Sequence, residues 1–183
     1  MPMIIYHGST VIVDIPEIQP VSRPLDFGIG FYTTTFKERA EEWAVKKAKK
    51  ENGTPVINVY DFDISEIHHL LAVKNFNSTS DEWLDFVLLH RNLTSYTINI
   101  EPRTKKRLLS AKSGVHHTFD VVIGEVANDD VFDSIEFYEA GVINKNELIR
   151  RLKTKSINDQ ICFCSSNALK YLKFNSHYMK AGV

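Results

Sequence analysis

Cysteine is scarce in this chain of 183 residues, which has only Cys162 and Cys164. Two thiols in a C-x-C arrangement imply no disulfide framework, and no other thiol is present to complete a zinc site. We therefore expect no metal centre and two reduced cysteines, as in a protein of the cytoplasm.

Excess charge and long apolar runs are also missing. The formal net charge is −1, so no strong field is expected to attract nucleic acid or an anionic membrane. No apolar run is long enough to cross a bilayer, and no basic segment followed by a long apolar run begins the chain. We expect neither a transmembrane helix nor a signal peptide.

The rest of the composition is typical of one soluble globular domain. Hydrophobic residues make up 43% of the chain and charged residues 25%, and this length allows a sizeable core. No internal repeat or low-complexity linker divides the sequence. We expect a single domain over residues 1–183.

Runs of β-branched and aromatic residues predict strands, and apolar residues at helical spacing predict helices. The expected strands cover residues 3–6, 30–35, 55–62, 120–126 and 160–163. The expected helices cover residues 35–50, a segment from Ser80, a segment within 141–153, and a last helix after Ser165 or Ser166 that carries Leu172 and Phe174. Strands from both ends of the chain with helices between them predict an α+β fold.

The helix over residues 35–50 has the clearest signals. Thr35 is its expected N-cap, with Glu38 completing a capping box, and Asn52-Gly53 is its expected end. Its expected buried face holds Ala40, Trp43, Ala44 and Lys47 or Ala48.

Two short stretches carry the functional signal. The first strand ends in His7-Gly8-Ser9, and Gly28-Ile29-Gly30-Phe31-Tyr32 enters the next strand. His7 can donate or accept a hydrogen bond near neutral pH, and the N–H and C=O of Gly8 can bind the two ends of a carboxamide. Tyr32 can stack on a flat ring. Nicotinamide is a flat ring that bears a carboxamide, so the two stretches together favour a nicotinamide site.

Each stretch alone has an ordinary structural explanation. A histidine after a strand is commonly solvated or bonded to a neighbour, and Gly-x-Gly before an aromatic residue is commonly a turn. This Gly-x-Gly also lacks the third glycine of the dinucleotide-binding fingerprint, which argues against a Rossmann domain. The occurrence of both stretches in this order is what favours the site.

Three motifs together resemble ADP-ribosyltransferases of the diphtheria-toxin and poly(ADP-ribose) polymerase type, which carry His, Tyr and usually Glu on three strands. The motifs are YHGS at residues 6–9, DFGIGFYTT at 26–34 and NDQICF at 158–163. Over nearly the whole chain, the sequence more closely resembles an uncharacterised bacterial domain family with DFGxGFYTT and QICF. The resemblance implies an ADP-ribosyltransferase-like split antiparallel β-core with flanking helices, and NAD as the substrate.

The resemblance also implies roles for single residues. His7 resembles the histidine that hydrogen-bonds a ribose hydroxyl of NAD, and Gly8 resembles the glycine whose backbone holds the nicotinamide amide. Tyr32 resembles the tyrosine that stacks on nicotinamide. Ser9 and Gly30 lie in the same expected NAD-binding stretches.

The third strand offers two residues for the remaining catalytic position. Alignment with the Asn-Glu-Tyr-Ile of the polymerases places Asp159 at the catalytic glutamate, whereas the closer family favours Gln160. Neighbouring residues of a strand point to opposite faces. Ile161 and Phe163 are the bulkier apolar pair and should face the core. Gln160 should then face the cleft with Cys162, and Asp159 should face solvent or cap the loop.

These inferences predict an NAD-dependent mono-ADP-ribosyltransferase, and the resemblance further implies a bacterial toxin neutralised by a small antitoxin encoded beside it. The acceptor stays open between protein, nucleic acid and a small molecule. An inactive NAD- or nucleotide-binding interaction module and an NAD hydrolase are the alternatives. Arg91 could reach an NAD phosphate or a carboxylate, and residues 128–130 could contact substrate or cap a turn.

Overall fold

The computed structural model describes residues 2–18, 25–90, 118–127, 134, 137–138, 140–152 and 158–180. Within these ranges the chain is a mixed α+β fold of two sheets and five helices. The strands are β1 (Met3–Ser9), β2 (Phe31–Thr33), β3 (Val56–Phe62), β4 (Val73–Asn75), β5 (Val121–Glu125), β6 (Asp159–Phe163) and β7 (Lys173–Met179). The helices are α1 (Lys37–Glu51), α2 (Ile64–Ile67), α3 (Asp81–His90), α6 (Lys145–Leu152) and α7 (Ser166–Leu169).

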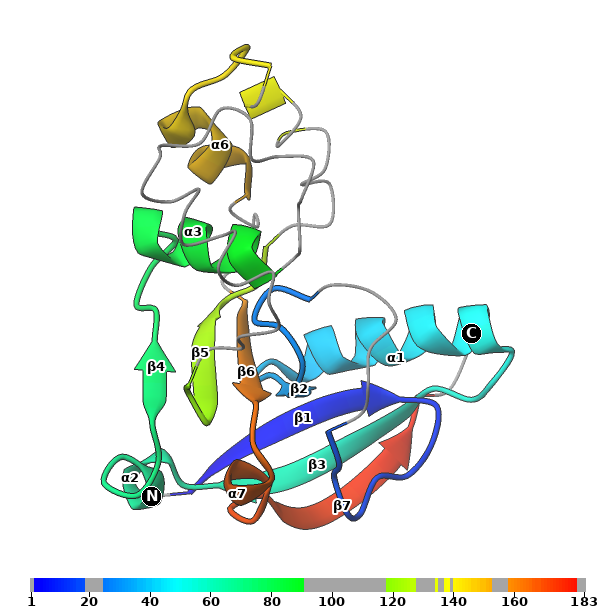
Figure 1. Cartoon of the computed structure of the whole chain (residues 1–183). Helices are drawn as coiled ribbons and strands as arrows, with labels where there is room; N and C mark the ends of the chain where they lie inside the picture. The colour runs from blue at the N-terminus through cyan, green and yellow to red at the C-terminus, as the bar shows by residue number, and fades with distance from the viewer. Residues whose placement is uncertain are drawn as a thin grey trace.

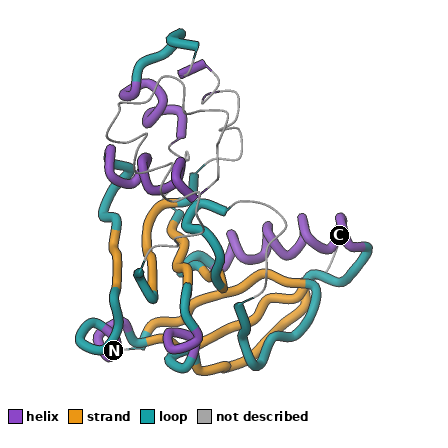
Figure 2. The backbone as a smooth tube through the Cα atoms, viewed as in Figure 1, coloured by secondary structure: helices purple, strands orange, loops and turns teal. Residues whose placement is uncertain are grey.

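The strands form two separate sheets, which run in different directions in Figure 2. The first sheet has the order β1-β3-β7 and is antiparallel throughout. The second has the order β2-β6-β5-β4, and its β4–β5 pair is parallel. The antiparallel cores of both sheets agree with the α+β class expected from the sequence.

One backbone bridge joins the two sheets within the described part of the chain. Tyr6 N–H donates to Thr34 O at 2.8 Å, and Thr34 N–H donates to Tyr6 O at 3.0 Å. β1 and β2 therefore meet at this point although they belong to different sheets.

The sheets share a hydrophobic core, and helices cover the faces turned away from it. The shared cluster includes Ile5, Tyr60 and Phe62 from the first sheet and Phe31, Ile161 and Phe163 from the strands of the second. In Figure 1, α1 lies along the first sheet, whereas α3 and α6 lie beyond the upper end of the second. A second buried cluster lies beneath these two helices and includes Phe27, Trp83, Val122, Leu148 and Cys162.

The ends of α1 differ in part from the expectation. The helix begins at Lys37 after Phe36, which makes no side-chain capping bond, so the expected Thr35 cap is wrong. Its end is as expected, because Asn52 takes a left-handed conformation and Gly53 N–H donates to Ala48 O. The buried face consists of Ala40, Ala44 and Ala48. Trp43 is 40% exposed, so placing it on that face was also wrong.

The C-terminal region differs more strongly from the expectation. Ser165 does cap α7 by accepting the N–H of Ala168, but the helix ends at Leu169. Residues 173–179 then form β7, an edge strand that pairs with β3. The expected long last helix is therefore wrong: Phe174 packs on the core shared by the sheets, and Tyr178 packs on the cluster beneath α1.

None of the helices in the described ranges combines the length and apolar character needed to cross a membrane.

Candidate functional site

The pairing of β1 with β2 ends at the Tyr6–Thr34 bridge, and His7, Gly8 and Ser9 follow it on β1. Hydrogen bonds of an antiparallel strand point to the same edge at every second residue. Since Tyr6 bonds toward β2, the N–H and C=O of Gly8 also point to that edge. Among the described strands, β1 pairs with β2 nowhere beyond the bridge. The N–H and C=O of Gly8 thus point to an edge of β1 that pairs with no described strand beyond the bridge.

The side chain of His7 bonds to β2 at the position where the next backbone pair between these strands would lie. Its Nδ1 lies 2.7 Å from Tyr32 O, and a carbonyl oxygen can only accept, so Nδ1 carries the hydrogen. The imidazole ring packs on Phe31, with ring centroids 4.3 Å apart. Burial lowers the pKa of His7 to about 4; the bond to Tyr32 raises the pKa, and the charge of Lys47 lowers it. The neutral ring therefore presents Nε2 as an acceptor near neutral pH.

This pKa predicts a pH dependence of stability. Between 6.5, the ordinary pKa, and about 4, the unfolded chain binds a proton at His7 that the folded chain does not. The His7 contribution is full above pH 6.5 and is lost as the pH falls toward 4. We expect the free energy of unfolding, measured with urea, to fall more steeply over this range in the wild type than in His7→Gln.

The matched control for that measurement is His177→Gln, because His177 is an exposed histidine on β7 of the same sheet. It should keep the wild-type slope. Equal slopes for the wild type and His7→Gln would show that His7 is not held neutral by the fold.

Gly8 is required by α1, not by the approach of a ligand to the chain. A Cβ at this position would lie 2.2 Å from Ala40 O and 2.8 Å from Ala44 N. The helix backbone thus fills the space beside Gly8. The sequence interpretation instead attributed the absence of a side chain at Gly8 to the close approach of a ligand.

Tyr32 connects two parts of the site. Its carbonyl binds His7, while its hydroxyl donates to Gly28 O at 2.7 Å and accepts Phe27 N–H at 3.1 Å. Burial raises the pKa of this hydroxyl well above its usual range, so it stays protonated. The hydroxyl is occupied in holding the turn at residues 27–28, and the ring packs against the second buried cluster.

Ser9 and Gly30, the other expected NAD-binding residues, both have structural functions. Ser9 is 2% exposed and its Oγ accepts Val11 N–H at 3.4 Å. A Cβ on Gly30 would lie 2.4 Å from Cys162 Sγ and 2.8 Å from Phe163 O. Gly30 is therefore required because the chain passes too close to β6 for a side chain at this position.

The predicted alternation along β6 is confirmed. Ile161 and Phe163 lie in the core shared by the sheets, and Cys162 lies in the second cluster. The face of Gln160 and Cys162 is not an open cleft, however, because the turn at residues 26–28 and α3 cover it. Gln160 is only 8% exposed, and its Nε2 donates to Asp26 Oδ2 at 2.8 Å and to Glu125 O at 3.3 Å.

Asp159 caps the loop before α1. The sequence predicts that its side chain either does this or faces solvent. Its Oδ1 accepts the Thr34 hydroxyl and the Thr35 N–H, both at 2.8 Å, and its Oδ2 accepts the Thr35 hydroxyl at 2.8 Å. The carboxylate thus fastens β6 to the segment that bridges to β1. This explains why Thr35 does not itself cap the helix.

Comparison with known proteins gives one match: residues 3–174 match a family described as "Protein of unknown function (DUF3990)". The chain belongs to this family. No curated protein and no solved structure matches. The family description assigns no activity, so the function of this DUF3990 chain has to be argued from its site.

Substitution of Asp159 tests whether its carboxylate has a structural or a catalytic role. We expect Asp159→Ala to lower the free energy of unfolding by about 1–2 kcal/mol, because three donors lose their acceptor. The NAD turnover that the motif resemblance implies should stay within about threefold of the wild type, because the carboxylate is bound to the loop.

The control is Asp61→Ala, which removes a strand carboxylate that accepts the exposed side-chain amide of Asn175. It should cost less than about 0.5 kcal/mol. Loss of NAD turnover in stable Asp159→Ala would make Asp159 the third catalytic residue and overturn the choice of Gln160.

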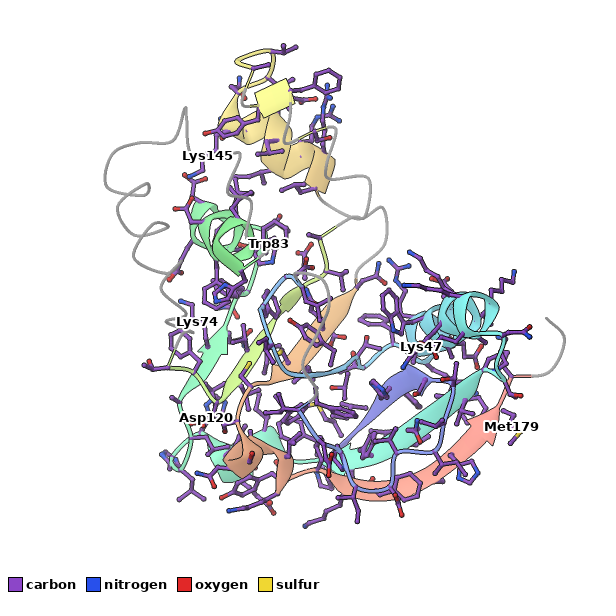
Figure 3. All side chains as sticks on the ribbon, turned by 45° about the vertical axis from the view of Figure 1, so that its right-hand side comes forward. Lys47, Lys74, Trp83, Asp120, Lys145 and Met179 are labelled. Carbon is purple, nitrogen blue, oxygen red and sulfur yellow. The ribbon has the colours of Figure 1, made fainter. Side chains whose placement is uncertain are left out.

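Sequence reasoning missed two residues of the site. Asp26 is 4% exposed and binds Gln160, and Lys47 on α1 lies close enough to His7 to lower its pKa. Figure 3 shows Lys47 on α1 above β1. Asp26 is the first residue of the DFGxGFYTT motif, which was the available signal. Lys47 was noted only as part of the buried helix face.

Two further predicted positions, Arg91 and residues 128–130, lie outside the described residues. Within the described ranges, no three His, Cys, Asp or Glu side chains gather as metal ligands would.

Proposed function

We propose that this chain is an NAD-dependent mono-ADP-ribosyltransferase whose nicotinamide end lies where β1 leaves β2. The observation that carries the proposal is the divergence after the Tyr6–Thr34 bridge. It leaves the Gly8 backbone pair at an edge beside a neutral imidazole whose Nδ1 is fixed by Tyr32 O. The N–H donor and the C=O acceptor of Gly8 and the Nε2 acceptor of His7 thus belong to neighbouring residues of β1.

This arrangement suits NAD in two ways. The N–H and C=O of Gly8 match the oxygen and the NH₂ group of a carboxamide. Nε2 of His7 accepts a hydrogen bond from a ribose hydroxyl, which is a donor. Because the fold holds His7 neutral, this acceptor is available throughout the pH range near neutrality.

The reaction breaks the bond between the ribose C1 and the nicotinamide nitrogen. Nicotinamide leaves as a neutral molecule with the bonding electron pair, and the ribose gains oxocarbenium character. A nucleophile on the acceptor forms the new bond to C1 and gives up its proton to solvent. Gln160 can orient the ribose hydroxyl but carries no charge. That is enough to transfer one ADP-ribose unit, whereas chain extension needs an activated acceptor hydroxyl.

An NAD-binding module without turnover is the second candidate. The observation in its favour is that both third-strand residues are already engaged: Asp159 caps the loop, and Gln160 binds Asp26. In that case the opening beside Gly8 would bind NAD and leave it intact.

The wider assignments belong to the same proposal and rest on the motif resemblance. They are an ADP-ribosyltransferase-like fold, a place in the bacterial cytoplasm, where NAD is available, and a toxin restrained by a small antitoxin protein. The acceptor is a protein, a nucleic acid or a small molecule.

Incubation of the pure chain with adenine-labelled NAD and a cell lysate tests the proposal. Label on a macromolecule supports the transferase, with nuclease and protease digestion identifying the acceptor class. Free ADP-ribose as the sole product would make the chain an NAD hydrolase. Intact NAD bound to the protein would favour the binding module.

A further inference from the structure

The thiol of Cys164 lies against the thiol of Cys162. The two Sγ atoms are 3.2 Å apart, and Cys164 Sγ also lies 3.5 Å from the carbonyl oxygen of Cys162. Both cysteines are reduced in the structure. Because a disulfide bond is about 2.0 Å long, the two sulfur atoms would have to approach by about 1 Å to bond. The side chain of Cys164 is thus already turned back toward the other cysteine of the chain.

The two thiols differ in their access to solvent. Cys162 belongs to β6, is 0% exposed and lies in the second buried cluster. Burial raises the pKa of its thiol well above the usual range, so Cys162 keeps its proton. Cys164 directly follows β6, packs at the margin of the same cluster and is partly exposed. An oxidant dissolved in water therefore meets Cys164 first, with Cys162 in contact behind it.

The backbone of Cys164 is also the less firmly held of the two. Cys162 pairs with Tyr32 of β2 on one side and with Val122 of β5 on the other. Cys164 lies beyond the last paired residue of β6, where its N–H donates to Asp120 O at 2.7 Å. In Figure 1 this is the point where β6 leads toward α7. If one of the two cysteines has to move, it is Cys164.

We propose that Cys164 and Cys162 form an oxidation site that hydrogen peroxide closes reversibly into a disulfide. Cys164 Sγ, as the thiolate, attacks one oxygen of the peroxide and the O–O bond breaks. The sulfur becomes a sulfenic acid, and the departing hydroxide takes up the proton that the thiol gave up and leaves as water. Cys162 Sγ then displaces the sulfenic oxygen, which leaves with the Cys162 proton as a second water. Two thiols lose two electrons, and one peroxide becomes two waters.

The geometry makes this disulfide easy to reduce. Residues two apart on a strand have Cα atoms about 6.5 Å apart, whereas most disulfides join Cα atoms about 5.5–6 Å apart. Closing the bond therefore pulls Cys164 back along the chain and strains the hydrogen bond from its N–H to Asp120 O. A strained disulfide is more readily reduced than an unstrained one. The site is thus suited to reversible oxidation and not to a permanent cross-link.

The experiment treats the reduced wild-type chain with hydrogen peroxide and then blocks any remaining thiols with an alkylating reagent. We expect the monomer to lose two hydrogen atoms by intact-mass analysis, with neither cysteine alkylated and with Cys162 joined to Cys164 in the peptide map. Reduced glutathione should restore both thiols. The amide hydrogen of Cys164 should exchange about tenfold faster in the oxidised chain, because its bond to Asp120 O is strained.

Two single variants separate the roles of the thiols. In Cys162→Ala the sulfenic acid has no neighbouring thiol, so Cys164 should gain one or more oxygen atoms where the wild type loses hydrogen. In Cys164→Ser the buried Cys162 should be oxidised at least about tenfold more slowly than the pair in the wild type. The Cys164→Ser change lies at a partly exposed position outside β6, so this variant should fold even if Cys162→Ala does not.

The inference concerns these two thiols alone and does not depend on the proposed function, so the absence of NAD turnover leaves it standing. Four results would overturn it: wild-type thiols that peroxide leaves intact, oxygen added to Cys164 without a disulfide, a disulfide between two chains, or one within the chain that glutathione does not reduce. Oxidation of Cys162 in Cys164→Ser at the wild-type rate would also contradict it, because Cys164 would then not be the thiol that meets the peroxide.

Discussion

His7→Ala is expected to release nicotinamide from NAD about ten- to a hundredfold more slowly than the wild type while keeping its fold. The variant loses the Nε2 acceptor for the ribose hydroxyl, and Tyr32 O loses the donor that holds the site together. A lost hydrogen bond with a desolvated partner costs about 1–3 kcal/mol, which corresponds to this loss of rate. Nicotinamide release under saturating and limiting NAD separates effects on kcat from effects on KM.

The fold should survive because the strand pairing on either side of His7 does not depend on the imidazole. The Tyr6–Thr34 bridge and the pairing of His7 with Asn58 are backbone contacts. His177→Ala, on the exposed edge strand, is the matched control and should keep full turnover. An equal rate for folded His7→Ala and the wild type would remove His7 from the site.

Gly8→Ala is expected to lower the free energy of unfolding by about 3 kcal/mol, the largest effect on stability among these variants. The added methyl group would meet backbone atoms of Ala40 and Ala44, which cannot rotate away as a side chain can. α1 would have to move away from β1. Urea unfolding at neutral pH measures the loss.

The control for this substitution is Gly53→Ala. Its Cβ would approach Thr10 Cγ2 at 3.2 Å, the end of a surface side chain, so the cost should stay below about 1 kcal/mol. If Gly8→Ala and Gly53→Ala unfold at the same urea concentration, the close packing of α1 on β1 is wrong.

The positions of the site residues could be predicted where local patterns determine them. The alternation of β6 followed from the size of Ile161 and Phe163, and the capping function of Asp159 followed from that alternation. Strand β3 was recognisable because its residues are β-branched or aromatic at nearly every position. Each of these inferences depends on residues that are neighbours in the chain.

The remaining features depend on contacts between distant segments. The bond from Gln160 to Asp26 spans 134 positions, and no periodic pattern indicates it. Trp43 falls at helical spacing with the alanines, but α1 presents the alanines to β1 because only small side chains permit the approach to Gly8. Phe174 also suits a helix, and the pairing of β7 with β3 decides in favour of a strand.

Direct observation of NAD by proton NMR in the presence of the pure chain tests the central claim most directly. The proposed function predicts that free nicotinamide appears at neutral pH with the wild type, with either added acceptor or water taking the ADP-ribose. It also predicts that the rate falls in His7→Ala but not in His177→Ala. NAD that stays intact with the wild-type chain, both alone and with lysate present, would contradict the assignment of this site to NAD cleavage.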